Sequence, residues 1–234
     1  SFVIMAGCLD GLRVKAQKLS YEGPFGVGYG VCTFVPESRS VGRNFLEDYK
    51  IKLRAELERR RKNEDEYVRL ARNALEVYVK TGKTISVPDG LPEDMTKRRT
   101  GTFVSLHKNG RLRGCMGTIT ASAASVAEEI INNAVCACSR DPRFHPVRPG
   151  ELDEISYSVD VLGAPEDISS PEELDVERYG VIVSCGHRRG LLLPDLEGVD
   201  TVEEQISIAM KKAGIAPGER DKVSLQRFEV ERHV

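Results

Sequence analysis

An internal repeat constrains the fold of this 234-residue chain more than any other feature. At a gapless offset of 76 residues, Arg113-Gly114 falls on Arg189-Gly190, and Ala137 falls on Ala213. Self-similarity at a fixed offset is typical of a duplicated supersecondary unit. The alternative is chance, because short amphipathic helices resemble one another easily.

Each repeat reads as a β-hairpin followed by a helix. Apolar runs flank a glycine turn in both repeats, at Asn109-Gly110 within residues 103–112 and near Gly186 within residues 181–193. Such runs around a tight turn predict two antiparallel hairpins.

The expected helices begin at Ser125 and Thr201, and each has a glutamate at its third helical position, as in a capping box. Residues 155–161 alternate apolar and polar side chains like a half-buried strand, and residues 223–230 do so with an apparent bulge. The predicted class is α+β, with a mixed, mostly antiparallel sheet built on the duplicated hairpin-helix unit.

One thiol stands out, within Arg111-Leu112-Arg113-Gly114-Cys115-Met116-Gly117-Thr118. Arginines precede Cys115 and glycines lie on both sides of it, which predicts an exposed thiol whose pKa is lowered by guanidinium groups. The repeat places Leu191 at the same position, so the fold does not require a cysteine there. The alternative is that Cys115 serves as a small buried hydrophobe.

The other cysteines predict neither a disulfide framework nor a metal site. A chain of this length does not depend on disulfides, which favours reduced thiols. Cys136 and Cys138 lie in an apolar run that reads as a buried helix face, and no second pair or nearby histidine completes a tetrahedral set. The glycine spacing matches no phosphate or dinucleotide loop, so we expect no metal and no cofactor.

The charge balance and hydropathy limit the partners. The 34 basic and 36 acidic residues nearly cancel, so no net field attracts nucleic acid or anionic lipid. A local basic surface at Lys97-Arg98-Arg99, Lys108, Arg111 and Arg113 leaves nucleic acid open as a partner, although stacking aromatics are not interleaved with it. No apolar run approaches the ~18 residues that span a bilayer, and no basic-then-apolar leader is present, which predicts a cytoplasmic protein without membrane contact.

Residues 1–36 are expected to form a β-rich segment without a helix of its own. The motif Gly7-Cys8-Leu9-Asp10-Gly11 and the glycine-rich residues 19–29 resemble the C-terminal tail of class III extradiol dioxygenase-like proteins of the LigB type. That family binds iron through residues upstream of the tail, so the resemblance implies no dioxygenase activity here. We expect a remnant of a larger domain, either docked on the next domain or mobile.

Residues 37–62 are expected to form a charged helical linker, and residues 63–234 a separate domain. Leu46, Tyr49, Leu53 and Leu57 share one stripe of the linker helix. Asn63 and Glu66 are expected to cap the following helix, and Gly82 is expected to end it.

Four further segments, in the same order, resemble the AMMECR-one domain family: residues 111–118, Asp141-Pro142-Arg143-Phe144, Ser158-Val159-Asp160-Val161-Leu162 and Gly190-Leu191-Leu192-Leu193-Pro194. The resemblance covers residues 64–231, about three quarters of the chain. It implies a cytoplasmic α+β domain with a cleft beside the Leu-Arg-Gly-Cys segment and no firmly assigned reaction.

The resemblance also implies partners. Genomic association in this family, summarised by the name AmmeMemoRadiSam, connects the domain to Memo-type relatives of extradiol dioxygenases and to radical S-adenosylmethionine enzymes, with nucleic-acid modification as a suggested role. His145 stands where the family pattern has proline, and His187 stands where arginine would be ordinary. A proton-transfer role common to the family is therefore not implied at either histidine.

The leading functional hypothesis is that Cys115 acts as a nucleophile or thiol carrier on an anionic substrate. Arg111, Arg113, Arg143, Gly114 and Gly117 form the predicted substrate site, with arginines as anion ligands. His107, on the preceding strand, and His145, after the following helix, are the candidate bases, although neither spacing demands contact. For Asp141 and Arg143 the alternative is a buried ion pair that braces the loop after the helix.

The rival hypothesis is a binding or adaptor module without catalysis. In that module the cleft around Cys115 holds a ligand or a partner's acidic segment, and the thiol only packs. An unreactive thiol is the property that separates this hypothesis from the enzyme.

Overall fold

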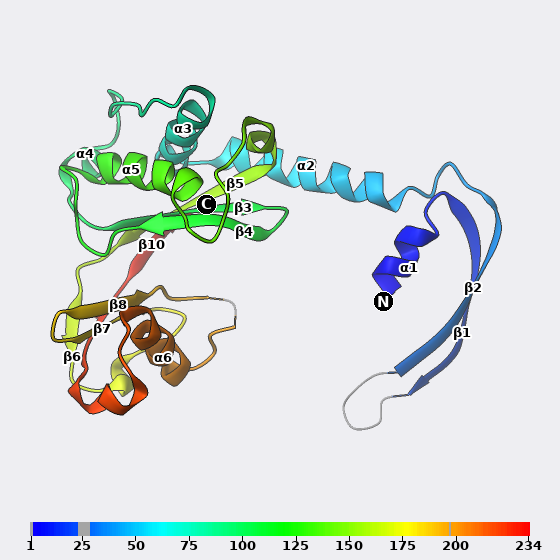
Figure 1. Cartoon of the computed structure of the whole chain (residues 1–234). Coiled ribbons are helices and arrows are strands. Elements are labelled where there is room, and N and C mark those ends of the chain that lie inside the picture. The colour runs from blue at the N-terminus through cyan, green and yellow to red at the C-terminus, as the bar shows by residue number, and fades with distance from the viewer. Residues whose placement is uncertain (1, 23–28, 197) are drawn as a thin grey trace. The chain divides into compact units, whose positions relative to one another are not determined.

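The computed structural model describes residues 2–22, 29–196 and 198–234 (Figure 1). The chain divides into two compact units, residues 1–59 and residues 60–234. Helix α2, Phe45–Asn63, crosses the division and makes up most of the predicted linker.

The first unit contains a short helix, α1 (Phe2–Cys8), and an antiparallel hairpin of β1 (Leu12–Glu22) and β2 (Tyr29–Arg39). The prediction that this segment has no helix of its own is wrong. Residues 2–6 are a continuous apolar run, and such short runs do not distinguish helix from strand by periodicity. Residues 23–28, part of the glycine-rich stretch noted above, lie outside the described residues.

Apolar side chains of the first unit are largely exposed. Leu19, Tyr21, Tyr29, Val31 and Val35 of the hairpin each expose more than half of their surface. Helix α2 carries no buried residue within its described length. This unit therefore has little core of its own.

Residues 60–234 form two similar halves. The first half in the chain contains α3 (Glu66–Thr81), α4 (Glu93–Lys97), β3 (Thr102–Lys108), β4 (Arg111–Gly117), α5 (Val126–Ser139), the 3₁₀ helix η2 (Pro149–Glu154) and β5 (Ile155–Leu162). The remainder contains β6 (Glu166–Ile168), η3 (Pro171–Glu173), β7 (Gly180–Cys185), β8 (Arg188–Leu192), α6 (Val202–Ala213), η4 (Pro217–Lys222), β9 (Ser224–Phe228) and β10 (Val230–His233).

The strands form two four-stranded antiparallel sheets of equivalent order. The first sheet runs β10-β5-β3-β4 and the second runs β6-β9-β7-β8. Strand β6 follows β5 in the chain but joins the second sheet, and β10 follows β9 but joins the first, as Figure 1 shows for the red strand. From here on, a half is one sheet together with the helices that pack on it. The strand that follows β5 in the chain, β6, and the strand that follows β9, β10, each join the sheet of the other half. The predicted duplication is confirmed.

The exchange explains the apparent bulge in residues 223–230. The chain leaves the second sheet after Phe228 and enters the first sheet at Val230, so the single strand predicted there is two strands in different sheets. The prediction was wrong in this respect because Glu229, at the crossover, does not interrupt the apolar alternation as a turn residue would.

A second part of the repeat follows the helices at a different offset. Pro149-Gly150-Glu151 opens η2 and Pro217-Gly218-Glu219 opens η4, and both 3₁₀ helices run directly into a strand. Register confirms the match, because Tyr157 pairs with the residue opposite Gly114 and Leu225 with the residue opposite Gly190. The gapless comparison missed this segment because the loops after the two helices differ in length.

The glycine of each hairpin lies directly under a helix. A Cβ atom at Gly114 would clash with the carbonyl oxygen of Ala137 in α5, and one at Gly190 would clash with Ala209 and Ala213 in α6. Side-chain volume is excluded at both positions, so close packing of helix on hairpin requires glycine in both halves.

Three apolar clusters form the core. One lies between the first sheet and α3, α4 and α5, and a second lies between the second sheet and α6. The third joins the halves through Leu162, Ile182, Leu191 and Phe228, with Phe103 packed against them. The halves therefore share a core and are not separate domains.

Helix α3 has a different N-cap from the one predicted. Asp65, not Asn63, precedes the helix, and its Oδ1 accepts hydrogen bonds of 3.0 Å from the backbone N–H groups of Tyr67 and Val68. Aspartate and asparagine are comparable caps, so the choice between them depends on tertiary contacts. The predicted end at Gly82 is confirmed, with φ of 73°.

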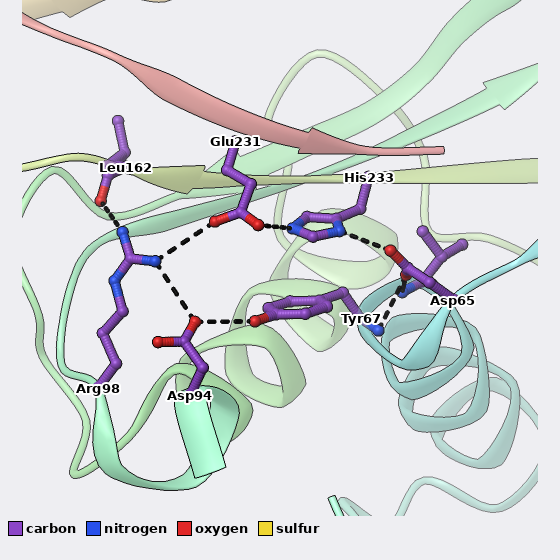
Figure 2. A network of polar contacts seen from close by, with 8 residues as sticks. Asp65, Tyr67, Asp94, Arg98, Leu162, Glu231 and His233 are labelled. Carbon is purple, nitrogen blue, oxygen red and sulfur yellow. Dashed lines mark hydrogen bonds and ion pairs between the residues drawn. The ribbon is translucent and has the colours of Figure 1, made fainter. Parts of the chain in front are cut away.

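A polar network around His233 holds the end of β10 to α3 (Figure 2). His233 Nδ1 lies 2.6 Å from Asp65 Oδ2, and the imidazole stacks on Tyr67 with ring centroids 3.9 Å apart. Arg98 lies 3.4 Å from Glu231 of the same strand. The exchanged strand is thus fastened by side chains as well as by the sheet.

Candidate functional site

Cys115 lies on β4 at the side of the first sheet, opposite Ser105 on β3. The Ser105 hydroxyl donates to Cys115 Sγ at 3.2 Å. The backbone N–H of Cys115 donates to Asp141 Oδ2 at 2.9 Å, and its carbonyl oxygen accepts from Arg143 at 3.2 Å. The loop after α5 therefore occupies the main-chain groups that this edge strand would otherwise present.

The surroundings of Cys115 raise the pKa of its thiol. Burial raises the pKa of Cys115, and the hydrogen bond from Ser105 and the charge of Arg143 do not offset it. Asp160 and Asp141 raise it further. The predicted lowering is wrong in direction because the nearby guanidinium groups are neutralised and the thiol is half-buried.

Two of the arginines predicted as anion ligands, Arg113 and Arg143, are each bound by a carboxylate. Arg113 donates from two nitrogens to Glu151, at 3.0 Å each, and Arg143 donates to Asp141 at 2.9 and 2.7 Å. The arginines hold the pKa values of Glu151 and Asp141 at about 2. Asp141 and Arg143 form the ion pair expected of a loop brace, but the pair is only partly buried, because the Arg143 side chain is 54% exposed.

Arg111 differs from both arginines. It is exposed and makes no hydrogen bond or ion pair within the described residues. Of the three predicted anion ligands, Arg111 is therefore the one that a ligand can reach without breaking an ion pair.

The two predicted glycines have packing roles. Gly114 lies under α5, as described above, and a Cβ atom at Gly117 would overlap the ring of Phe103. Close packing alone accounts for glycine at both positions.

Neither candidate base contacts the thiol. His107 pairs across the hairpin with Leu112, its side chain is half-buried, and burial lowers its pKa, with smaller effects of Arg60 and Arg232 in the same direction. His145 is exposed in the loop after α5. The groups that interact with Cys115 Sγ are the Ser105 hydroxyl and the guanidinium of Arg143, and neither is a base.

Lys212 of α6 is a site residue that the sequence reasoning missed. Its Nζ donates to the carbonyl oxygen of Leu191 at 3.3 Å, and Leu191 is the counterpart of Cys115 in the repeat. Burial lowers the pKa of Lys212, the charge of Arg143 lowers it further, and Cys115 acts in the opposite direction. Lys212 comes from the second half, so both halves contribute to the surroundings of the thiol.

Little in the sequence marks Lys212. A lysine in the last turn of a helix reads as a favourable interaction with the helix dipole. The repeat gives the one usable signal: Leu191 corresponds to Cys115, so groups that contact Leu191 belong near the thiol.

Asp160 is a second missed residue, although it lies in one of the family motifs. It is 4% exposed and pairs with Phe103 in the register of the first sheet. Arg232 on the exchanged strand donates to Asp160 at 2.8 Å and lies 3.4 Å from Asp195. A buried carboxylate bound in this way connects β5 to both β10 and the second half.

No group of three histidine, cysteine, aspartate or glutamate side chains in residues 2–22, 29–196 and 198–234 is placed to hold a metal ion. Over the same residues, none of the helices combines the length and hydropathy that crossing a bilayer requires.

Fold and site together define an internally duplicated α+β domain with a cysteine where its halves meet. A family model described as AMMECR1 matches residues 68–233. The chain belongs to the AMMECR1 family.

Individual relatives extend this result. Protein CA_C1420 of Clostridium acetobutylicum is 45% identical over 234 residues, which are all of this chain and 49% of that protein, so the chain spans about half the length of this relative. A protein of Thermotoga maritima is 53% identical over 171 residues, covering 73% of this chain and 98% of its own. The crystal structure titled uncharacterized protein PH0010 from Pyrococcus horikoshii matches with a TM-score of 0.66 and 35% identity, covering 71% of this chain and 88% of that one.

Proposed function

We propose that residues 60–234 form a non-catalytic binding module and that the surroundings of Cys115 take a small anionic ligand. The proposal is supported chiefly by two observations. Arg113 and Arg143 form ion pairs with carboxylates, and burial raises the pKa of Cys115, which favours the protonated thiol. Arg111 and Lys212 are the cations left to meet a ligand. The site is in the cytoplasm, as the family resemblance implies.

The alkylation rate of Cys115 as a function of pH tests the proposal. Mass mapping separates this thiol from the others, and Cys115→Ser is the blank. The binding module requires an apparent pKa above the ~8.5 of a free thiol. An apparent pKa below about 8 in the protein without ligand would contradict it.

The second candidate function is a Cys115-dependent enzyme that acts on an anionic, nucleic-acid-related substrate in an AmmeMemoRadiSam-type pathway. The observation in its favour is that Lys212 lies close enough to Cys115 to interact with it electrostatically, and that burial of its amine lowers the pKa of Lys212; in its neutral form an amine can take the proton of a nearby thiol. This function requires that Lys212→Met slow alkylation of Cys115 above neutral pH. Equal rates in the two proteins would remove it.

The predicted basic surface favours a protein or small-molecule partner over nucleic acid. Lys97 pairs with Glu93, Arg98 with Asp94, and Lys108 with Glu154, so much of its charge is neutralised. Memo-type proteins and radical S-adenosylmethionine enzymes, implied by the resemblance, are the partners to test first, by co-purification with the full chain.

For the first unit we propose that residues 1–36 are the end of a LigB-type domain and that residues 37–62 are a linker. The exposed apolar side chains of the hairpin and the greater length of the Clostridium relative support this. The test is co-expression of the chain with the half of the Clostridium protein that lies outside the match. Stable co-purification that depends on residues 1–36 is expected, and its absence would contradict the assignment.

A further inference from the structure

Helix α3 covers a surface of the first half, and in the described residues no helix covers the equivalent surface of the second half. In the first half, α3 packs on α5, β5 and η2. The equivalent elements of the second half are α6, β9 and η4, and no helix comparable to α3 packs on them within the described residues. Because the two halves have the same arrangement of strands and helices, the second half exposes the surface that α3 covers in the first half.

A groove lies at this position. It has a volume of about 540 Å³ and is lined by Ile206 of α6, by Arg220 and Asp221 of η4, and by Val223 and Leu225 at the start of β9. Ile168 of the edge strand β6 closes one side. In the first half the place of β6 is taken by β10, whose His233 contacts the start of α3.

Burial of matched residues shows the difference. Ile155 and Tyr157, beneath α3, are 0% and 5% exposed. Their counterparts Val223 and Leu225 are only half-buried. Partly exposed aliphatic side chains at positions that a helix covers in the other half are typical of a surface that binds a partner.

The charges indicate what the occupant carries. In the first half Arg61, just before α3, donates to the carbonyl oxygen of Leu152 at 2.7 Å and lies 3.9 Å from Asp153. The residue equivalent to Asp153 is Asp221, which is exposed and makes no ion pair in the part of the chain that the structure describes. An arginine of the occupant can therefore bind at Asp221 as Arg61 binds at Asp153.

We propose that this groove binds an amphipathic helix of a partner protein, with an arginine shortly before its first turn. The chemistry of the helix follows from α3, whose buried face consists of small and aliphatic residues: Val68, Leu70, Ala71, Ala74 and Leu75. An amphipathic helix laid in an apolar groove is a common mode of peptide recognition. The groove is separate from Cys115, so it does not depend on the function proposed for the thiol.

The chain supplies its own probe for the test. A fluorescein-labelled peptide with the sequence of residues 60–82, stapled on its exposed face between the positions of Arg69 and Asn73, is titrated with the full chain. Anisotropy is expected to saturate. Leu225→Asp is expected to weaken binding about 10-fold or more, because burial of a leucine is worth ~1.5–3 kcal/mol.

Two further variants test the charge and the location. Asp221→Lys is expected to weaken binding of the peptide about threefold. A second peptide, with glutamate in place of arginine at the Arg61 position, is expected to restore binding to the Asp221→Lys variant. Val87→Asp, on the surface of the first half, serves as the matched control and is expected to leave binding unchanged.

Crosslinking separates groove binding from displacement of α3. A benzophenone at the peptide position of Ala74 is expected to label residues 167–171 and 217–225. Labelling of α5 and η2 in their place would mean that the peptide exchanges with α3 itself, and would overturn the proposal. Failure of the stapled peptide to saturate up to about 1 mM would also overturn it.

Discussion

The two halves of residues 60–234 place different side chains on the same hairpin. Leu191 on β8 is 6% exposed and packs in the shared core, whereas its counterpart Cys115 on β4 bonds to Ser105 and lies near Arg143 and Lys212. Both carbonyl oxygens accept a hydrogen bond from a cation, from Arg143 at Cys115 and from Lys212 at Leu191. The difference shows that the backbone plan needs the cation at this position but not the thiol.

The helices offer a second comparison. Glu129 of α5 and Gln205 of α6 occupy equivalent positions, and both are fully buried. Glu129 accepts hydrogen bonds from the loop before the helix, whereas Gln205 Nε2 donates to the carbonyl oxygen of Tyr179 at 2.8 Å. One position thus fixes a loop by accepting and the other fixes a strand by donating.

The largest expected effect comes from replacing the glycine that lies under the helix in each half. Gly114→Val and Gly190→Val should each cost about 4 kcal/mol or more, because a branched side chain cannot fit between hairpin and helix. Thermal unfolding measures the loss. Gly150→Ala is the control, since nothing lies within 4 Å of its Cβ position, and it should change stability by no more than about 0.5 kcal/mol.

The next largest effect is expected at the equivalent buried polar residues of α5 and α6, and it should differ between the two helices. Glu129→Gln should cost about 2–3 kcal/mol, because the amide has only one oxygen, and its NH₂ group would face a donor of Ser122 or Ala123 at the position of the second carboxylate oxygen. Gln205→Leu should cost less, because leucine nearly keeps the buried volume and only one hydrogen bond of the side chain is lost. Urea unfolding measures both, and equal losses would contradict the assigned difference.

The arginine pairs give a smaller, pH-dependent effect. Glu151, bound to Arg113, has its pKa lowered to about 2, so its stabilisation is complete above its unfolded pKa near ~4.3 and is lost as the pH falls toward 2. Arg113→Met should cost about 2 kcal/mol at pH 7 and flatten this acid dependence. In the second half Glu219, the counterpart of Glu151, pairs with Arg188, the residue before the counterpart of Arg113. This pair is more exposed, so Arg188→Met should cost less; a larger loss there would reverse the comparison.

The smallest effects are expected from substitutions at Cys115 and at Leu191, its counterpart in the second half. Leu191→Cys should cost about 1–2 kcal/mol, because it removes buried methyl groups from the shared core. Cys115→Ser should stay within about 1 kcal/mol, since the thiol is only half-buried and the hydroxyl can keep the hydrogen bond with Ser105. Denaturant midpoints of the two variants, measured side by side, decide the point.

The sequence predicted the hairpins, the helix starts and the class of fold because those features depend on local patterns. Ser125 and Thr201 cap their helices as expected. The strand exchange could not be predicted, since Leu162 and Phe228 lead into β6 and β10 without a signal that the partner sheet changes. A register shift in the first hairpin near Arg113 was also missed, and it moves the true repeat of β3 by one residue relative to the gapless offset.

The candidate site was predicted only where its residues are adjacent in sequence. Cys115 and the pair of Asp141 and Arg143 follow from motifs, but Lys212 of the second half and Asp160 on β5 act on the thiol electrostatically from segments distant in the sequence. The direction of the pKa shift of Cys115 was missed because burial is its largest cause, and burial depends on tertiary packing that the local motif does not show. Glu151, which pairs with Arg113, also lies 38 residues along the chain.

The exchange of β6 and β10 between the halves has a parallel in domain-swapped dimers. A protein with only one hairpin-helix unit would send its last strand away from its own sheet and would leave that sheet one strand short. Such a unit completes its structure by trading strands with an identical copy, as domain-swapped dimers do. The present arrangement therefore has the form of a strand-swapped homodimer whose two copies are joined in one polypeptide, so that the two halves can carry different side chains on the same backbone plan.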